Sequence, residues 1–445
     1  MPGVTWKFVR TGDHMNTIQI KMQQWAKNPC PLTLQGAVQH YAWGGTDFIP
    51  QLIGCENPQG KPFAELWLGD HPGAPALAEV EGEWFPLNQV VKAAPSIILG
   101  EESRARYGDK LPYLLKALDA KTMLSIQVHP SKKRAEQGYS RENAAGLPSE
   151  SPERSYRDDN HKPEVHVALT GFWMLHGFRP LEEIADLLSR YPQFGAIMPD
   201  FGWRLGRSGS EPAARKELIH TLYAEVMTMP QLRVDDLLNP LLERLEAGPT
   251  PLQSDPDYWA LLASRTFPLP DGHRDRGIFS IYLLNLLHLM PGEGTWQPAG
   301  ILHAYLEGIN IELMAGSDNV LRGGLTPKRV DVPELLATLD FSDGKPKILG
   351  RDSKKSGETC YRTNAKEFEL SRIDLLSNTA LLNIAFAGPD TLLVLDGDMT
   401  LTCANDQRHI SRGGAVLIPY NFDYLIQAGK GGVKIFRAAV PPIKK

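Results

Sequence analysis

The feature that most constrains the fold of this chain is a change in the spacing of its apolar residues. Before residue 181 and after about residue 277, apolar residues form short runs broken by Gly and Pro. Between 181 and 265 they recur three to four positions apart with charges between them. The first pattern is typical of strands joined by turns, and the second of amphipathic helices. With 445 residues, too many for one compact core, the chain should form a mainly β protein with a helical insertion.

Local patterns place individual elements within this outline, and short strands with frequent turns indicate a sandwich or a barrel. Strands are expected at Ala64–Gly69, Leu124–Val128 and Glu164–Leu169, and β structure returns from about residue 277. Outside the insertion, helices are expected at Tyr113–Leu118, after Ser131 and at Val332–Leu339. Loops are expected at Ser151–Asp158 and Gly206–Pro212, and a turn at Pro291–Gly294.

Residues 360–440 are again β-type, and one run in them resembles a cupin hairpin. Turns are expected at Gly388-Pro389, Asp396–Asp398, Gly413-Gly414 and Gly431-Gly432. The region contains one histidine, His409, so no second metal site is expected there. It should form a second, smaller β domain.

Composition excludes several classes of protein. The apolar fraction of 42% and charged fraction of 22% are ordinary for a globular protein. A net charge of −5 gives no general attraction to nucleic acids or acidic membranes. The four cysteines are far apart, and neither a secretory apolar segment nor a membrane-length one occurs. We expect a cytoplasmic protein, a monomer by default, that holds any anion with a local basic cluster.

The first group of candidate site residues lies in the run SIQVHP. On a strand, Ser125, Gln127 and His129 would share one face, with Ile126 and Val128 on the other. Two ligand atoms on one strand face can reach a common metal ion. Such a pair is, however, more often a polar strand face, and Gln is an uncommon zinc ligand.

The second group lies in the run NHKPEVH. Glu164 begins the expected strand and can supply a third ligand, and His161 and Lys162 precede it. Loop charges are usually solvated, and His166 reads equally well as a core histidine.

In the third group, His303 follows a Pro/Gly turn in apolar surroundings, and Glu312 lies beyond it. Asp318, Arg322 and Lys328 surround a double glycine. These side chains suit a phosphate or sugar hydroxyls, because Arg offers a fork of donors. A charged loop after a strand is an equally simple interpretation. No nucleotide-binding, HExxH or GxSxG motif competes.

Taken together, these motifs resemble the type I mannose-6-phosphate isomerases, in the family's order and over roughly residues 31–440. The resemblance is carried by Tyr41–Gly44, Ala64–Pro72, Ser125–Pro130, Asn160–Glu164, Pro298–Tyr305 and Ser317–Lys328. It implies a catalytic cupin (jelly-roll) barrel and one zinc ion per chain. The implied zinc ligands are Gln127, His129, Glu164 and His303.

The resemblance also implies an interconversion of mannose 6-phosphate and fructose 6-phosphate through a cis-enediol. The expected catalytic residues are Arg322, Lys162, Asp318 and Glu312, the last by residue type alone. The expected substrate- and phosphate-binding residues are Ser125, His161 and Lys328. Arginine keeps its proton at any ordinary pH, so Arg322 should stabilise negative charge and not act as a base.

The expected domains are an N-terminal extension (1–30), a discontinuous catalytic cupin domain (31–180 and 266–335), a helical insertion (181–265) and a cupin-like C-terminal domain (336–445). Two other readings stay open. Another cupin metalloenzyme, such as an iron oxygenase, can use two His and a carboxylate. A non-enzymatic sugar-binding bicupin has the same fold without the chemistry.

Overall fold

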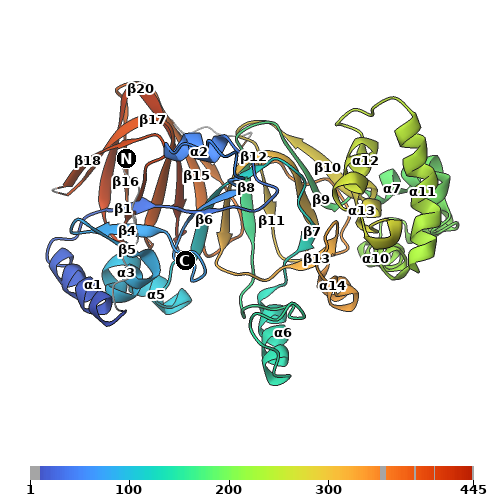
Figure 1. Cartoon of the computed structure of the whole chain (residues 1–445), viewed down its shortest axis with the longest axis horizontal. Coiled ribbons are helices and arrows are strands. Elements are labelled where there is room, and N and C mark those ends of the chain that lie inside the picture. Colours follow the sequence, from blue (N-terminus) through green and yellow to red (C-terminus); the bar gives the residue numbers. More distant parts are fainter. Residues whose placement is uncertain (1–10, 351–356, 385–386, 405, 443–445) are drawn as a thin grey trace. The chain divides into compact units, whose positions relative to one another are not determined.

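The computed structural model describes residues 11–350, 357–384, 387–404 and 406–442. They divide into two compact units. Unit 1 takes in the described residues of Met1–Leu118, Ile311–Gly316 and Asp352–Lys445. Unit 2 takes in Asp119–Asn310 and the described residues of Ser317–Arg351. The strands form antiparallel sheets and the helices concentrate between 181 and 283, so the expectation of a mainly β chain with an inserted helical stretch is confirmed (Figure 1).

The large sheet of unit 1 is antiparallel, in the order β14-β15-β20-β17-β19-β1-β4-β5, with β16 beside β20 and β18 beside β17. Apolar side chains of β15, β17, β19 and β20 form its core. Its strands are β1 (Leu32–Gln35), β4 (Leu77–Val80), β5 (Glu83–Pro86), β14 (Glu358–Tyr361), β15 (Glu369–Leu375), β16 (Ala380–Ile384), β17 (Asp390–Cys403), β18 (Asp406–Ser411), β19 (Ala415–Ile418) and β20 (Asp423–Ala439).

Strands β17 and β20 show that two of the turn predictions were wrong. Both strands continue through the glycine-containing segments at 396–398 and 431–432. The pairing shifts register there, and Gly397 and Gly432 have positive φ values of 71° and 80°. A Cβ on Gly397 would lie 2.1 Å from the carbonyl oxygen of Gly432. The glycines therefore form bulges where the two strands cross closely. The turn at Gly413-Gly414 is confirmed.

The N-terminal residues that are described form α1, in which Ile18, Met22 and Trp25 are buried. The predicted helix at Tyr113–Leu118 is instead a strand, β6, buried on both faces, so its sequence shows no alternation. Strands β2 and β3 continue antiparallel beside β6. These elements of unit 1 are α1 (Thr11–Trp25), β2 (Ala37–Gln39), α2 (Phe48–Ile53), β3 (Glu65–Leu68), α3 (Leu87–Ala93), α4 (Pro95–Leu99), α5 (Glu101–Tyr107) and β6 (Tyr113–Ala120, which ends in unit 2).

Unit 2 is built on antiparallel strands, and several of these strands contain candidate site residues. β9 pairs with β10 and β12, β8 pairs with β11, and β7 lies between β12 and β13. The strands are β7 (Ile126–Val128), β8 (Glu164–Ala168), β9 (Phe172–Phe178), β10 (Leu284–Leu289), β11 (Gly294–Gln297), β12 (His303–Ala315, shared with unit 1) and β13 (Leu321–Gly324). The strands predicted after residues 124 and 164, the turn near 291 and the loop at 151–158 are confirmed.

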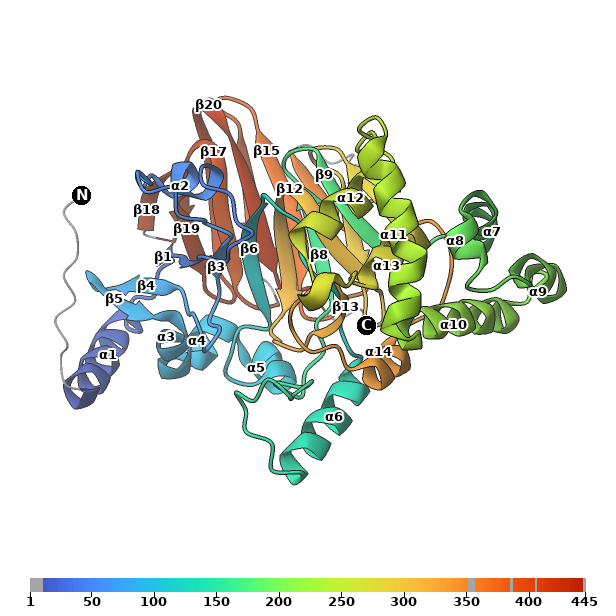
Figure 2. The same ribbon diagram turned by 45° about the vertical axis from the view of Figure 1, so that its right-hand side comes forward.

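The helices formed by residues 212–283 gather beside β9 and β10 in both views (Figures 1 and 2). Two predictions here were wrong. Residues 277–283 form a helix buried on every side, whose period the sequence cannot display, and α9 extends into the predicted loop at 206–212. The helices are α6 (Lys132–Ala144), α7 (Leu181–Arg190), α8 (Pro192–Gly195), α9 (Phe201–Ser208), α10 (Pro212–Thr228), α11 (Gln231–Ala247), α12 (Pro256–Thr266), α13 (Gly277–Leu283) and α14 (Val332–Thr338). The short η1 (Pro270–Gly272) precedes α13. Within the described ranges, no helix combines the length and apolar character needed to cross a membrane.

Candidate metal centre

The candidate site residues of unit 2 are organised by a row of three side chains across neighbouring strands. Gln127 on β7 lies opposite His303 on β12 and opposite Arg322 on β13. Directly opposed residues of antiparallel strands point to the same face of the sheet. The structure therefore brings His303, Gln127 and Arg322 together, although 176 positions separate the first two in the sequence (303 minus 127).

The other face of these strands explains why the row is so well fixed. Ile126 and Val128 flank Gln127 on β7 and are fully buried. They belong to one apolar core with residues of the helices, among them Tyr223 of α10 and Phe279 of α13. The helices thus cover the face opposite the row, and a slip of one residue in β7 would expose two core side chains.

Three titratable side chains converge beside this row. His129, Glu164 and His303 offer ligand atoms that all lie within 4.8 Å of one another. Nε2 of His129 is 3.3 Å from Oε1 of Glu164, and Nε2 of His303 is 3.6 Å from Oε2. Ligand atoms that each lie about 2.0–2.2 Å from a tetrahedral ion are separated by roughly 3.3–3.6 Å. The spacing matches what a shared metal ion requires.

The two imidazoles are oriented for metal binding. Nδ1 of His129 donates to the carbonyl oxygen of Asn319 at 2.7 Å, and Nδ1 of His303 donates to that of Ile301 at 2.9 Å. Their Nε2 atoms are buried, with no hydrogen-bond partner among the described residues. Burial lowers the pKa of His303 to about 3, so its ring is neutral and Nε2 carries a lone pair. Such Nδ1 contacts to backbone carbonyls are usual for metal-binding histidines.

Glu164 completes the set as a buried anion. Burial alone would raise the pKa of its carboxyl group, but the charges of Lys162 and His129 hold that pKa well below its usual range. Nζ of Lys162 lies 3.0 Å from Oε1. The amide of Gln297, opposite Glu164 on β11, donates to Oε2 at 2.7 Å. Two imidazoles and one carboxylate form a donor set that zinc accepts.

One asparagine connects this cluster to the basic loop beside it. Asn319 is 0% exposed, and its carbonyl oxygen accepts the bond from His129. Its side-chain oxygen accepts from the backbone N–H of Arg157 at 2.7 Å. Its side-chain nitrogen donates to the carbonyl oxygens of Asp158 and Asn160, each at 2.8 Å. The loop that leads into Lys162 is therefore fixed by the same residue that orients a candidate ligand.

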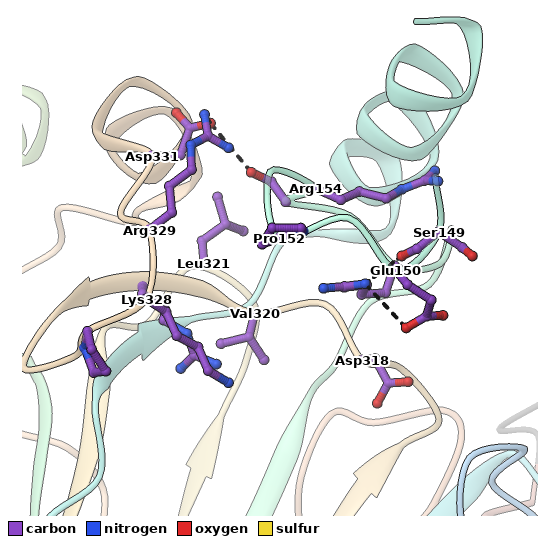
Figure 3. Close-up of a pocket in the computed structure, with 14 residues that line it drawn as sticks. Ser149, Glu150, Pro152, Arg154, Asp318, Val320, Leu321, Lys328, Arg329 and Asp331 are labelled. Carbon is purple, nitrogen blue, oxygen red and sulfur yellow. Dashed lines mark hydrogen bonds and ion pairs between the residues drawn. The ribbon is translucent and has the colours of Figure 1, made fainter. Parts of the chain in front are cut away.

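A pocket of about 740 Å³ lies over β13 and this loop. Figure 3 shows Val320 between Lys328 and Asp318, with the loop that carries Ser149 and Glu150 on the far side. Cationic side chains predominate among its charged residues, which suits an anionic ligand. The charged lining residues are Glu150, Arg154, Arg157, Asp318, Arg322, Lys328, Arg329 and Asp331.

The cations of this pocket repel one another. Nη1 of Arg322 donates to the hydroxyl oxygen of Ser125 at 2.7 Å, and burial lowers the pKa of Arg322. The charge of Arg322, then burial, then the charge of Arg157 lower the pKa of Lys328. A cation whose pKa is lowered by neighbouring cations is stabilised by a bound anion.

The remaining predicted site residues lie in different surroundings. Asp318 is exposed, and its backbone N–H donates to Asp158 at 2.7 Å. His161 is half-buried beside Lys162. Glu312 belongs to unit 1, where its carboxylate lies 3.1 Å from the buried Nζ of Lys116. The catalytic role of Glu312 stays a prediction.

Sequence reasoning missed three polar residues that the structure makes prominent: Gln297, Asn319 and Lys116. The first two act on candidate ligands. Lys116 is buried with Glu65 and Glu312 in unit 1. A charged residue inside the otherwise apolar run YLLKAL was the only signal for Lys116. The role of Gln297 depends on the pairing of β8 with β11, which no local pattern reveals.

Comparisons with known proteins agree with this geometry. The family described as phosphomannose isomerase type I, catalytic domain, matches residues 32–181. The mannose-6-phosphate isomerase of Escherichia coli K12 is 37% identical over 401 residues, covering 89% of this chain and 97% of that protein. The rat enzyme of the same name is 33% identical, covering 90% and 96%. A crystal structure of the Salmonella typhimurium enzyme with fructose 6-phosphate and zinc has a TM-score of 0.80 at 31% identity, covering 93% of this chain and 100% of that one. The chain therefore belongs to the mannose-6-phosphate isomerase family.

Proposed function

We propose that this protein is a zinc-dependent aldose-ketose isomerase that interconverts D-mannose 6-phosphate and D-fructose 6-phosphate through a cis-enediol. The observation that carries the proposal is the pair of unpartnered Nε2 atoms of His129 and His303 facing Glu164 at ligand spacing. A pocket lined by cations extends from the neighbouring strand. Family membership supplies the reaction, and the site supplies the groups that the reaction needs.

Zinc fits the residues that are present. His129, Glu164 and His303 would hold it, and Gln127 is proposed as the fourth ligand because it lies opposite His303 on the same sheet face. One ion per chain is proposed. The Salmonella relative whose crystal structure contains zinc and fructose 6-phosphate supports this assignment.

The finer organisation of the chain is also part of the proposal. We infer a cupin jelly-roll for the catalytic domain, formed by 31–180 and 266–335. A helical insertion at 181–265, an extension at 1–30 and a smaller cupin-like domain at 336–445 complete it. The helical core of unit 2, which packs behind the row of His303, Gln127 and Arg322, supports a scaffolding role for the insertion.

The isomerisation moves a proton between C1 and C2 of the open-chain sugar, and negative charge develops on the oxygens of these carbons. A bound zinc ion supplies a Lewis acid that stabilises this charge. Arg322 supplies a fixed positive charge on the same sheet face, held in place by Ser125. A positioned donor of this kind contributes about 2.7–4 kcal/mol of transition-state stabilisation.

The phosphate group is assigned to the pocket. Ser125, His161 and Lys328 are the proposed substrate-binding residues, and Lys328 lies with Arg322 in the pocket lining. A phosphate dianion beside these groups would cancel the repulsion that lowers the pKa of Lys328. Unphosphorylated mannose lacks this interaction and should be a poor substrate.

The roles of the acidic and basic side chains in proton transfer are assigned from their charges. Nζ of Lys162 lies 3.0 Å from Oε1 of Glu164, with which it forms an ion pair. Lys162 is therefore better suited to hydrogen-bond a substrate oxygen than to accept a proton. Asp318, whose carboxylate lies in the lining of the pocket, is the proposed proton acceptor. Glu312 is the third residue proposed to take part in proton transfer.

No observation favours an iron oxygenase or a non-enzymatic sugar-binding protein, and the relatives are isomerases by name. A cytoplasmic monomer whose only partner is a small sugar phosphate remains the working expectation. Nucleic acids and membranes are not proposed as partners. Isomerisation can serve either mannose breakdown or the synthesis of GDP-mannose.

The proposal is tested with purified protein in a coupled assay. Mannose 6-phosphate should yield fructose 6-phosphate, and unphosphorylated mannose should react far more slowly. Oxygen uptake and iron content measured on the same preparation address the oxygenase. Iron in place of zinc, or no product from mannose 6-phosphate, would contradict the proposal.

A further inference from the structure

We propose that Gln297 is a positioning residue that fixes the carboxylate of Glu164 and so sets how tightly the site retains its metal. This inference rests on the proposed zinc site but not on the sugar substrate. Gln297 is the last residue of β11, directly opposite Glu164 on β8. Its amide nitrogen donates to Oε2 at 2.7 Å, a short and well-formed bond.

The two oxygens of Glu164 have matching surroundings. Oε1 faces Nε2 of His129 at 3.3 Å and Nζ of Lys162 at 3.0 Å. Oε2 faces Nε2 of His303 at 3.6 Å and the amide of Gln297. Each oxygen thus has one candidate co-ligand and one donor. Without Gln297, only Lys162 would restrain the carboxylate, which could then rotate about its last side-chain bond.

Burying the side chain of Gln297 at this position costs free energy. It is 1% exposed, and its amide oxygen is buried with no hydrogen-bond partner among the described residues. A buried amide group left without a partner costs roughly 1–3 kcal/mol. An apolar side chain would avoid that cost, so the stability of the fold does not explain why a glutamine occupies this position. The hydrogen bond to Glu164 explains it.

The segment that begins at Gln297 contacts all three clustered side chains or their backbone. Gln297 bonds Glu164, the N–H of Gly300 donates to the carbonyl oxygen of His129 at 2.9 Å, and His303 is itself in the cluster. Gly300 has a φ of 87°, so the turn between these contacts depends on glycine. One stretch of seven residues, 297–303, therefore assembles the site, and Gln297 is its side-chain contact to the carboxylate.

The test compares Gln297→Met with wild type and with Gln193→Met, a matched loss of an amide on α8 away from the cluster. Zinc release into an excess of a chromogenic chelator is followed with the zinc-loaded protein. Gln297→Met should bind zinc about 10- to 100-fold more weakly, as expected for loss of a partner that orients a metal ligand. The absorption spectrum of the cobalt-substituted protein should shift, because Glu164 is held differently. Gln193→Met should behave as wild type in both measurements.

Gln297→Asn provides a second variant, because it keeps an amide but is one methylene too short to reach Oε2. It should also release zinc faster, and the melting temperature of metal-free Gln297→Met protein should change little. Zinc release at the wild-type rate from both variants would overturn the inference, as would a loss of metal-free stability without faster release. None of these measurements uses a sugar, so they test the role of Gln297 independently of the reaction. If the wild-type protein fails the isomerase assay while the Gln297 variants release zinc faster, the proposed reaction is contradicted and the role of Gln297 is supported.

Discussion

Two buried polar clusters, one in each unit, have similar burial and opposite chemistry. In unit 2, the Nε2 atoms of His129 and His303 have no hydrogen-bond partner within the described part of the chain, although a carboxylate faces them. In unit 1, Asp390 is 1% exposed and its Oδ2 accepts from the hydroxyl of Tyr424 at 2.6 Å and from Nε of Arg437 at 2.8 Å.

The unit 1 cluster is complete without a ligand. Arg437 also pairs with Glu358 at 2.9 Å, and among the described residues no side-chain atom of this network is buried without a hydrogen-bond partner. Burial raises the pKa of Asp390 against the opposing effect of Arg437. A buried charge that is paired and hydrogen-bonded needs no further ligand, whereas convergent acceptors without donors require a cation. Burial of charge alone does not identify a site, but unsatisfied and convergent ligand atoms do.

The largest difference between the clusters should appear when a ligand is removed. His303→Ala deletes one of two imidazoles, and the remaining groups cannot retain zinc, so metal content should fall to background and activity with it. His129→Ala should do the same. Metal analysis of the purified variants by mass spectrometry is the measurement. Wild-type zinc content in either variant would show that the cluster is not the metal site.

A substitution in the cluster of unit 1 should have the opposite effect, lowering stability without loss of zinc. Arg437→Met leaves Asp390 buried without its cation, which should cost about 3–5 kcal/mol of unfolding free energy. Zinc content per folded chain should stay at the wild-type level, because the network contains no candidate ligand. Chemical denaturation and metal analysis of the same sample would show this. A variant that lost zinc but kept its stability would invert the assignment of the two clusters.

Arg322→Ala tests the division of labour within unit 2. Because Arg322 contributes charge and no metal ligand, the variant should keep its zinc and its fold. The turnover number should fall by about 10²–10³-fold, equivalent to roughly 2.7–4 kcal/mol. Steady-state kinetics supply the measurement, and Arg265→Ala, which changes an exposed arginine in the last turn of α12 outside the pocket, is the control. An unchanged turnover number would remove Arg322 from the mechanism.

The smallest predicted effect is a pH dependence of stability that comes from a buried carboxyl group of unit 1. Asp70 accepts one neutral hydrogen bond, from the N–H of Leu111 at 2.8 Å, and burial raises its pKa to about 6. The folded protein therefore holds this proton to a higher pH than the unfolded chain does, whose carboxyl titrates near ~3.9. The contribution of Asp70 to wild-type stability should therefore fall by roughly 2–3 kcal/mol as pH rises from about 4 to about 6.

Asp70→Asn keeps an acceptor for Leu111 and removes the charge. Its stability relative to wild type should therefore increase over the same pH range and then level off. Unfolding free energies measured at several pH values give the comparison. A constant difference across that range would show that the pKa of Asp70 is the same in the folded and the unfolded protein.

Much of the candidate site was predictable from sequence, because the relevant residues sit in short motifs. Alternation along one strand placed Gln127 and His129 on one face, and the structure agrees that Ile126 and Val128 face the core. No periodicity argument could bring His303 to Gln127, because their contact depends on strand pairing over a long separation. That step came from the resemblance of several motifs together.

The sequence was least informative where burial is complete. The strand at 113–120 and the helix at 277–283 are buried on every side, so neither displays the period of its structure, and each was predicted as the other type. Gly397 and Gly432 predicted turns but form bulges, since both uses need a positive φ. The role of Gln297 was invisible for the same reason as that of His303, because it depends on pairing between β8 and β11.

The most direct test of the account is a zinc titration of metal-free protein, with conversion of mannose 6-phosphate to fructose 6-phosphate as the readout. His129, Glu164 and His303 converge on one position, so activity should be lost on chelation and return linearly until one zinc ion per chain is bound. Full activity in the metal-free protein, or recovery that needs a second ion per chain, would contradict the single-zinc site proposed for unit 2.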